Sequence, residues 1–110
     1  MEQGVNTAAY NSSKSAVLQL ARSLAADWGT QEGKASTIRV NSLSPGYIET
    51  PLSAGARAKP EILRQWIGDN MLHRISKPEE YRAPVLFLLS DGSSFMTGAD
   101  LRVDGGHCAW

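Results

Sequence analysis

Stretches with helical periodicity alternate with short strand-like stretches along this chain. Apolar residues recur at helical spacing over residues 8–28, and a short apolar, partly β-branched stretch follows at 38–43. Two more helices are predicted, one over 61–72 and one from 76 to about 90, and a second strand over 99–103. The order helix, strand, helix, helix, strand is typical of an α/β fold with parallel strands joined by helices. We therefore predict an α/β architecture.

Glycine and proline mark the predicted boundaries of these elements. Gly29 is placed to end the first helix, and Pro45 with Gly46 stops the first strand. Pro78 suits the first turn of the last helix, with Ser76 or Lys77 at its cap. Pro84 lies inside that helix, so we expect either a kink or a late start there. The non-periodic stretches 29–37 and 47–59 are predicted loops, and the second has the length of a segment that covers a site.

Composition and charge exclude several classes of protein. The 110 residues carry 11 Lys and Arg against 11 Asp and Glu, so no basic excess points to nucleic acid. The longest apolar run, at residues 85–89, is far shorter than the roughly 20 residues of a membrane span. The single cysteine cannot form an internal disulfide, and the first residues carry no secretory signal. We therefore expect a cytoplasmic protein with neither a nucleic-acid nor a membrane partner.

Tyr10 and Lys14 are the most informative pair of residues. They are four positions apart on the first predicted helix, so they share one side of it, together with Val17 and Ala21. Lysine rarely lies unpaired on an apolar face, and an ammonium beside a phenol lowers the pKa of the phenol. Such a phenol can exchange a proton with a carbonyl or alcohol oxygen. The alternative is a core tyrosine beside a lysine whose ammonium reaches solvent.

Several further segments, taken in order, resemble the C-terminal half of a short-chain dehydrogenase/reductase. Beside residues 10–14 (YNSSK), the resemblance rests on six more segments: 21–24 (ARSL), 38–46 (IRVNSLSPG), 47–50 (YIET), 78–80 (PEE), 87–91 (FLLSD) and 97–106 (TGADLRVDGG). Their order and approximate spacing match the family over nearly the whole chain. The sequence is most similar in character to the fungal-type sugar and polyol reductases of this family.

The resemblance implies a fold and a domain organisation. Residues 1–110 would be a single partial domain, the C-terminal part of a Rossmann-type doubly wound parallel sheet, and therefore incomplete. The segment at about 47–72 would be the family's lid, where substrate preference is set. The family's glycine-rich phosphate turn and its asparagine motif are absent from the sequence, and none of the nine residues before Tyr10 is the family's catalytic serine.

The resemblance also implies residue roles. Tyr10 would donate or accept the proton, and Lys14 would lower the pKa of Tyr10 and bind the nicotinamide ribose of NAD or NADP. The cofactor would also be held by Pro45, Gly46, the backbone of Ile48 and the hydroxyl of Thr50, and Tyr47 would border the substrate pocket. His73, His107 and Cys108 have no metal-ligand spacing, so no metal site is expected.

Two functions follow for the chain. The first is a segment of an NAD(P)-dependent oxidoreductase that transfers hydride between the cofactor and a small carbonyl or alcohol substrate such as a ketose or polyol. Its full-length form would be a homo-oligomer, and the 110 residues alone would have little or no activity. The second is an inactive, truncated fragment that acts at most as an oligomerisation or interaction piece.

Overall fold

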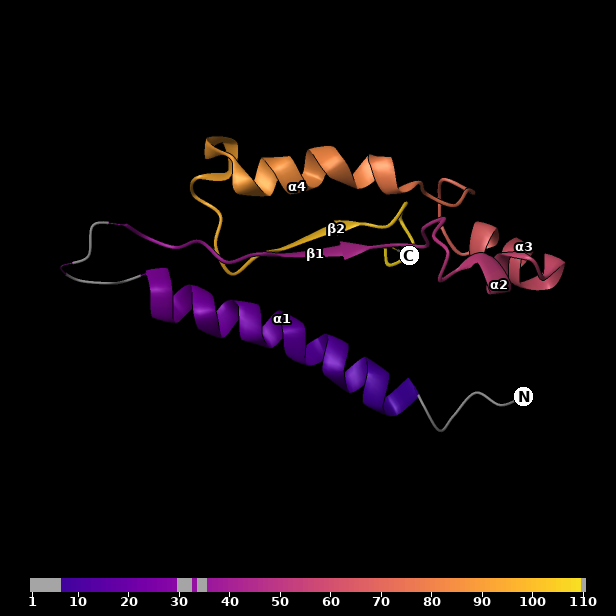
Figure 1. The fold of residues 1–110 in the computed structure, drawn as a ribbon, viewed down its shortest axis with the longest axis horizontal. Coiled ribbons are helices and arrows are strands. Elements are labelled where there is room, and N and C mark those ends of the chain that lie inside the picture. Colours follow the sequence, from indigo (N-terminus) through magenta and orange to yellow (C-terminus); the bar gives the residue numbers. More distant parts are fainter. Residues whose placement is uncertain (1–6, 30–32, 34–35, 110) are drawn as a thin grey trace. The chain divides into compact units, whose positions relative to one another are not determined.

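The computed structural model describes residues 7–29, 33 and 36–109 of the chain. It is an α/β structure whose elements appear in Figure 1. In chain order they are the helix α1 (Thr7–Gly29), the strand β1 (Ser42–Pro45), the helices α2 (Ala54–Arg57) and α3 (Pro60–Gly68), the 3-10 turn η1 (Pro78–Tyr81), the helix α4 (Arg82–Leu89), the 3-10 turn η2 (Asp91–Ser93) and the strand β2 (Asp100–Val103). The predicted loop at 29–37 lies largely outside the described residues.

The two strands lie side by side as a two-stranded sheet (Figure 1). At one end, the Ser42 N–H donates a hydrogen bond of 2.9 Å to the Ala99 carbonyl oxygen. At the other end, the Gly46 N–H donates one of 3.0 Å to the Val103 carbonyl oxygen. Because both chains advance by the same four residues between these bonds, the pairing is parallel. The predicted α/β class is therefore confirmed, with α2, α3 and α4 in the connection between the two strands.

The first strand begins later than the sequence pattern predicted. Residues 38–43 were expected to form it, whereas β1 runs from Ser42 to Pro45. Ahead of Ser42 the Gly98 N–H still donates to the Val40 carbonyl at 2.7 Å, but side chains make the other bonds between the two segments. The Asn41 amide donates to the Met96 carbonyl and accepts from the Ala99 N–H. The hydroxyl of Thr97 accepts a bond from the Val40 N–H in the same way. The predicted boundaries of β1 were wrong because the regular backbone pairing with β2 begins only at Ser42. The apolar pattern at 38–43 does not show where this pairing begins.

The chain divides into two compact units. The first comprises Met1–Ser42 and Ser94–Asp100, and the second comprises Leu43–Ser93 and Leu101–Trp110. In the first unit α1 has the predicted bounds, and its buried apolar side chains are Ala21 and Ala25. In the second unit Ile75 and Tyr81 are the buried apolar residues. Each unit thus has a small core of its own.

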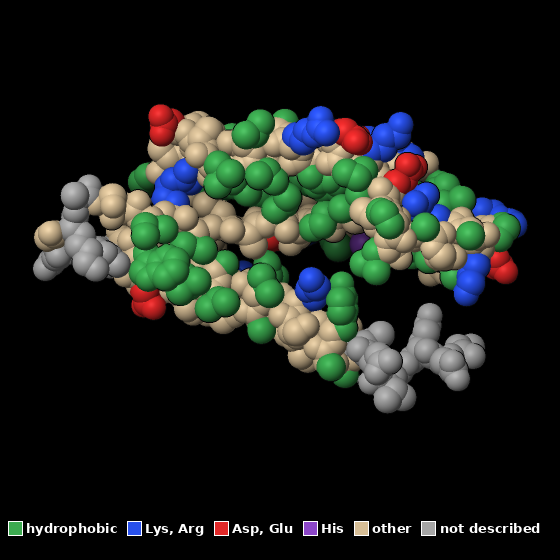
Figure 2. Space-filling view, in the orientation of Figure 1, with side chains coloured by type: hydrophobic (Ala, Val, Ile, Leu, Met, Phe, Trp, Pro, Cys, Tyr) green, Lys and Arg blue, Asp and Glu red, His purple; other side chains and the backbone are tan. Residues whose placement is uncertain are grey.

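Large apolar side chains remain exposed on several elements. They include Val17 and Leu20 on α1, Leu86 and Leu89 on α4, and Phe95 beyond η2. Figure 2 shows hydrophobic side chains at the surface of both α1 and α4. A parallel sheet normally has helices packed on both faces and further strands at its edges, and two strands offer little surface for these helices to cover.

In the second unit, α3 is shorter than its apolar periodicity predicted. The helix was expected over 61–72 but ends at Gly68. The cause is Asn70, whose side chain is buried, at 3% exposure, and donates to the carbonyl oxygens of both Trp66 and Arg74. These two bonds fold the chain into a turn at the point where the helix would otherwise continue. Likewise, the predicted loop at 47–59 contains a short helix, α2.

The last helix has the late start that Pro84 indicated. Pro78 opens η1 with Lys77 at its cap, and the α-helical part begins only at Arg82. Pro84 is therefore in the first turn of α4, where its missing N–H leaves no helical hydrogen bond unmade. The cap at Lys77 and the late start of the α-helix were both predicted correctly.

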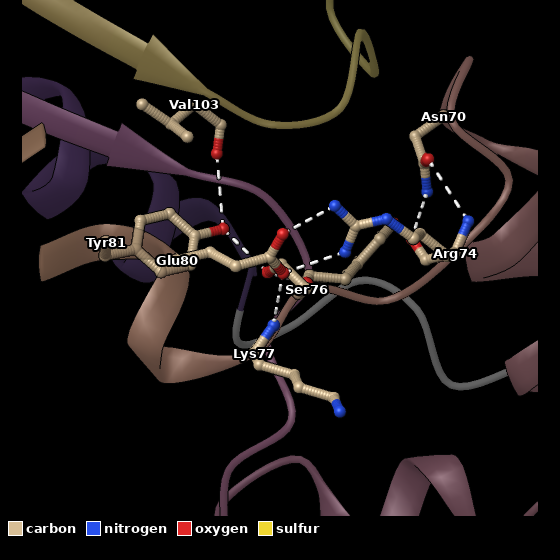
Figure 3. A network of polar contacts seen from close by, with 8 residues as sticks. Asn70, Arg74, Ser76, Lys77, Glu80, Tyr81 and Val103 are labelled. Atoms are coloured by element: carbon tan, nitrogen blue, oxygen red, sulfur yellow. Dashed lines mark hydrogen bonds and ion pairs between the residues drawn. The ribbon is translucent and has the colours of Figure 1, made fainter. Parts of the chain in front are cut away.

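A polar network holds η1 against the turn that follows α3 (Figure 3). The Arg74 guanidinium forms two hydrogen bonds with the Glu80 carboxylate, and the one from Nη1 to Oε2 measures 2.8 Å. The same carboxylate accepts the Lys77 N–H at 2.8 Å. Beside it, the hydroxyls of Ser76 and Tyr81 are 2.7 Å apart, and Tyr81 also donates to the Val103 carbonyl of β2. The network therefore ties η1 to the sheet.

We expect Asn70→Ala to destabilise the second unit. The change removes a buried amide and the two hydrogen bonds that it donates to the carbonyl oxygens of Trp66 and Arg74, and each lost bond typically costs about 0.5–1.5 kcal/mol. The free energy of unfolding in urea, followed by tryptophan fluorescence, measures the effect. Asn11→Ala, at an exposed position on α1, is the control. A loss no larger for Asn70→Ala than for Asn11→Ala would contradict the role of the Asn70 amide.

The Glu80 carboxylate is expected to titrate at an unusually acid pH. Hydrogen bonds from Arg74 and from the Lys77 backbone lower its pKa to about 2. Because the folded pKa is below that of the unfolded chain, the pair stabilises the fold above about pH 4.5 and loses this effect as the pH falls through about 2. Carbon-13 NMR of the side-chain carboxyl group measures the midpoint directly.

Arg74→Gln should raise this midpoint toward the usual value for glutamate, since it removes the principal donor. Arg64→Gln removes the same charge from an exposed position of α3 and should leave the midpoint unchanged. Equal midpoints in the two variants would mean that Arg74 is not the cause of the low pKa.

Candidate functional site

Tyr10 and Lys14 face each other near the N-terminal end of α1. Their four-residue spacing places them one helical turn apart, and the Lys14 ammonium nitrogen is 5.5 Å from the centre of the Tyr10 ring. At this distance the cation interacts with the ring face. Within the described residues, Lys14 makes no hydrogen bond or ion pair, so its three N–H donors are free for a ligand.

The burial of the stripe that contains Tyr10 differs along the helix. Ala21 and Ala25 are buried, but Tyr10 is 61% exposed and Val17 is also exposed. This stripe is the side of α1 that carries Tyr10, Lys14, Val17 and Ala21, and the sequence predicted that it would face the core. In the described structure, only the C-terminal half of the stripe is covered, so the Tyr10 phenol is open to a small molecule.

The second group of predicted residues follows β1. Gly46 lies directly against the backbone of Asp104, the residue after β2: a Cβ at position 46 would lie 2.8 Å from the Cα of Asp104. Glycine is therefore required here by a close backbone approach and not by an unusual φ angle. Pro45, the last residue of β1, precedes this contact. The pair Pro45 and Gly46 thus fixes the direction in which the chain leaves the sheet.

Ile48 is held in place by a parallel bridge to Ser76. The bridge consists of a hydrogen bond from the Ser76 N–H to the Tyr47 carbonyl at 3.0 Å and one from the Glu49 N–H to the Ser76 carbonyl at 2.9 Å. In such a bridge the N–H of the central residue points away from the partner. Among the described residues, the Ile48 N–H accordingly has no hydrogen-bond partner. A backbone donor is therefore available at a fixed position.

Thr50 is fixed by two residues that the sequence analysis did not identify. The Ser53 hydroxyl accepts the Thr50 N–H at 3.0 Å and donates to the Ile48 carbonyl at 2.7 Å. The Arg57 guanidinium donates to the Ser53 hydroxyl at 3.0 Å and to the Thr50 carbonyl at 3.1 Å. Threonine and serine three residues apart in a proline-containing turn were the signal that could have revealed this arrangement.

Tyr47 packs among side chains of the second unit. Its ring stacks on Trp66, with 4.5 Å between centres, and its hydroxyl donates a hydrogen bond of 3.3 Å to the Asp69 carboxylate. Burial raises the pKa of the Tyr47 phenol, and the negative charge of Asp69 raises it further. Tyr47 therefore keeps its proton and does not suit acid–base exchange, in contrast to the role expected of Tyr10.

Tyr47 also lines a pocket of about 80 Å³ in the second unit. The pocket is bounded by polar groups, among them Arg74, Glu80 and the buried Asn70. Of the residues expected to bind substrate or cofactor, Gly46 and Tyr47 line it. Tyr10 and Lys14 belong to the first unit and Pro45 to Thr50 belong to the second, so the structure brings each group together within its own unit.

No metal centre or membrane-spanning element occurs in the described part of the chain. Within residues 7–29, 33 and 36–109, no three His, Cys, Asp or Glu side chains are close enough to hold a metal ion. Over the same residues, no helix is both long and apolar enough to cross a membrane.

Comparison with known proteins gives a consistent set of relatives. A family model described as enoyl-(acyl carrier protein) reductase matches residues 2–107. The short chain dehydrogenases/reductase notP' of Aspergillus versicolor is 68% identical over 108 residues, which are 98% of this chain and 37% of that protein. The galactitol 2-dehydrogenase of Rhizobium johnstonii is 45% identical over 102 residues, covering 93% of this chain and 38% of the relative.

Solved structures match in the same way. The crystal structure of gox2181 has a TM-score of 0.85 and 44% sequence identity, covering 94% of this chain and 38% of that one. A 4-hydroxyisoleucine dehydrogenase complexed with NADH has a TM-score of 0.82 and 33% identity, covering 94% of this chain and 40% of that one. The predicted incomplete Rossmann-type fold is confirmed by these neighbours.

The chain thus spans 37–40% of the length of the relatives and solved structures named here. The family model and the Aspergillus versicolor relative both cover nearly all of this chain, including the tyrosine–lysine helix, the Pro-Gly turn and the second strand. The chain belongs to the short-chain dehydrogenase/reductase family.

Proposed function

We propose that this chain is the proton-transfer and nicotinamide-binding part of an oxidoreductase that moves hydride between NAD or NADP and a carbonyl or alcohol carbon. The observation that carries the proposal is the pair on α1: an exposed Tyr10 phenol with the Lys14 ammonium 5.5 Å from its ring. The family to which the chain belongs supports it.

Tyr10 is the proposed acid–base residue. In the direction of reduction its hydroxyl protonates the carbonyl oxygen of the substrate, and in the direction of oxidation it takes the proton of the alcohol. Lys14 stabilises the negative charge that Tyr10 carries after it has given up the proton, because opposite charges attract strongly at short range. Its N–H donors are also suited to the hydroxyls of the nicotinamide ribose.

The residues after β1 fit a nicotinamide cofactor. The unpartnered Ile48 N–H is a donor of the kind that a carboxamide oxygen requires, and the Thr50 hydroxyl lies in the same fixed turn. Pro45 and Gly46 set where this turn begins. When bound, NAD or NADP supplies the hydride acceptor or donor, and the protein supplies position and electrostatics.

A ketose or polyol is the proposed substrate class. Relatives with 42–45% identity carry the names galactitol 2-dehydrogenase, NADH-dependent L-xylulose reductase and D-arabinitol 2-dehydrogenase. Tyr47 is proposed to border the substrate pocket, and residues 47–72 to act as the lid. The two helices α2 and α3 make up half of this segment.

A cytoplasmic location and a homo-oligomeric full-length form complete the proposal. A single cysteine, exposed and unpaired in the structure, suits a reducing compartment. The exposed apolar side chains on α1 and α4 are of the kind that subunit contacts cover. The same exposure favours the second candidate function, an inactive piece that only mediates assembly.

Replacement of Tyr10 separates the two functions. The test protein is a chimera in which this chain replaces the matching 37% of the Aspergillus versicolor relative. Tyr10→Phe should lower kcat by about 10²–10⁴-fold on the substrate that the chimera uses best, because the proton donor is lost. Galactitol, D-arabinitol and L-xylulose form the substrate panel, with NADH or NADPH and their oxidised forms as cofactor.

Two further variants serve as comparisons in this test. Lys14→Gln should weaken cofactor binding, measured by NADH fluorescence, as well as turnover. Arg22→Gln removes the same charge from an exposed position of α1 and should change neither. If Tyr10→Phe keeps its activity within a few-fold of the chimera, the catalytic proposal is wrong. If the chimera binds cofactor but uses no substrate of the panel, the ketose or polyol class is wrong.

The 110-residue chain alone should bind NADH or NADPH weakly and show little or no turnover. The reason is that its sequence has no glycine-rich turn to receive the pyrophosphate at a helix N-terminus. Fluorescence titration with the polyol panel present measures both properties. Binding in the micromolar range together with turnover would contradict this prediction.

A further inference from the structure

Four side chains from three segments of the second unit form what we term the Tyr47 cluster: Tyr47, Trp66, Asp69 and His107. Tyr47 follows β1, Trp66 and Asp69 lie at the C-terminal end of α3, and His107 follows β2. The Tyr47 and Trp66 rings are stacked with an angle of 7° between their planes. The His107 ring meets the Tyr47 ring edge-on, with 5.4 Å between centres. The Tyr47 ring is therefore contacted by two other rings.

The hydrogen bonds of the cluster define its polar groups. The Tyr47 hydroxyl donates to Asp69 Oδ2 at 3.3 Å, and His107 Nδ1 lies 3.0 Å from the Asp69 carbonyl oxygen. A carbonyl oxygen only accepts, so Nδ1 carries the proton. Asp69 thus accepts a hydrogen bond from the Tyr47 phenol on its side chain and one from the His107 imidazole on its carbonyl oxygen. It therefore links the segments that contain Tyr47 and His107.

Glycines after β2 bring His107 to this position. Gly105 and Gly106 both have positive φ angles, of 65° and 89°, which other residues rarely adopt. A Cβ on Gly105 would lie 3.0 Å from the Asn70 side chain, and one on Gly106 would lie 2.9 Å from Met71. The chain after β2 therefore passes directly beside the residues that follow α3, and His107 comes within reach of Asp69.

Asp69 lies at the end of α3. It is the C-cap of α3, where the helix carries partial negative charge and a carboxylate is unfavourable. Its carboxylate accepts a hydrogen bond from Tyr47, one of the residues that line the pocket of the second unit. A phenol that keeps its proton gives this hydrogen bond a fixed direction. The orientation of the Tyr47 ring is consequently determined by an acceptor 22 residues away in sequence.

We propose that Asp69 is a positioning residue for substrate binding: it holds Tyr47, stacked on Trp66, as a rigid wall of the substrate pocket at the anchored end of the lid. This inference rests on the proposed function. A wall held in one orientation lowers the KM for a small polyhydroxylated substrate, because no side-chain freedom is lost when the substrate binds. It touches no reacting atom, so kcat does not depend on it.

The test uses the same chimera and the same substrate panel. Asp69→Ala and Tyr47→Phe should each raise KM by up to about tenfold, because the substrate would then have to order a ring that is no longer held in one orientation, while kcat stays within about twofold. The double variant should resemble either single variant, because both changes remove the same interaction. Asp69→Asn keeps an acceptor oxygen and should restore most of the affinity. Asp91→Ala, at an exposed aspartate of the same unit, should leave KM unchanged.

The outcomes separate this inference from the proposed function. If Tyr10→Phe abolishes turnover but Asp69→Ala and Tyr47→Phe leave KM unchanged, only the positioning role is wrong. Additive effects on KM, or equal losses in kcat for both variants, also overturn it. A purely structural role would lower the melting temperature without separating KM from kcat. If Asp69→Ala fails to fold, Tyr47→Phe and Asp69→Asn still give the comparison, since each keeps the shape of the side chain that it replaces.

Discussion

The close approach of the two strands at Gly46 is the constraint on which the second unit depends. The Gly46 N–H closes the parallel pair by donating to Val103, and any Cβ at Gly46 would collide with the backbone of Asp104. The residues that follow the two strands, Tyr47 after β1 and Gly105 and Gly106 after β2, therefore start from neighbouring positions. Every contact of the Tyr47 cluster starts from this pairing.

The proposed site combines residues that are placed in two physically different ways. Tyr10 and Lys14 are neighbours because an α-helix repeats every 3.6 residues, so their proximity needs no tertiary contact. Ile48 and Thr50 are placed by bonds from elsewhere: the bridge to Ser76 and the hydroxyl of Ser53. The first kind of placement is robust to changes in the rest of the chain, whereas the second fails if a single distant partner is lost.

Sequence patterns predicted elements well where the signal is local. The bounds of α1, the capped start of η1 at Pro78 and the late start of α4 all follow from periodicity and from the missing N–H of proline. The patterns failed where a side chain competes with the backbone. Asn41 bonds to backbone groups more than 50 residues away and Asn70 to carbonyl oxygens four residues away on either side, and they delay β1 and shorten α3 respectively. Nothing in the identity of an asparagine indicates which carbonyl oxygen it will find.

The amino-acid sequence by itself determined the family, the α/β class and the tyrosine–lysine pair, because each rests on order and spacing along the chain. Only the tertiary structure decided the surroundings of Tyr47, since its partners Asp69 and His107 come from other segments of the chain. Likewise, periodicity placed Tyr10 on an apolar stripe, but its exposure depends on which parts of that stripe other segments cover. Spacing is a property of the covalent chain, whereas burial and hydrogen-bond partners are properties of the packed molecule.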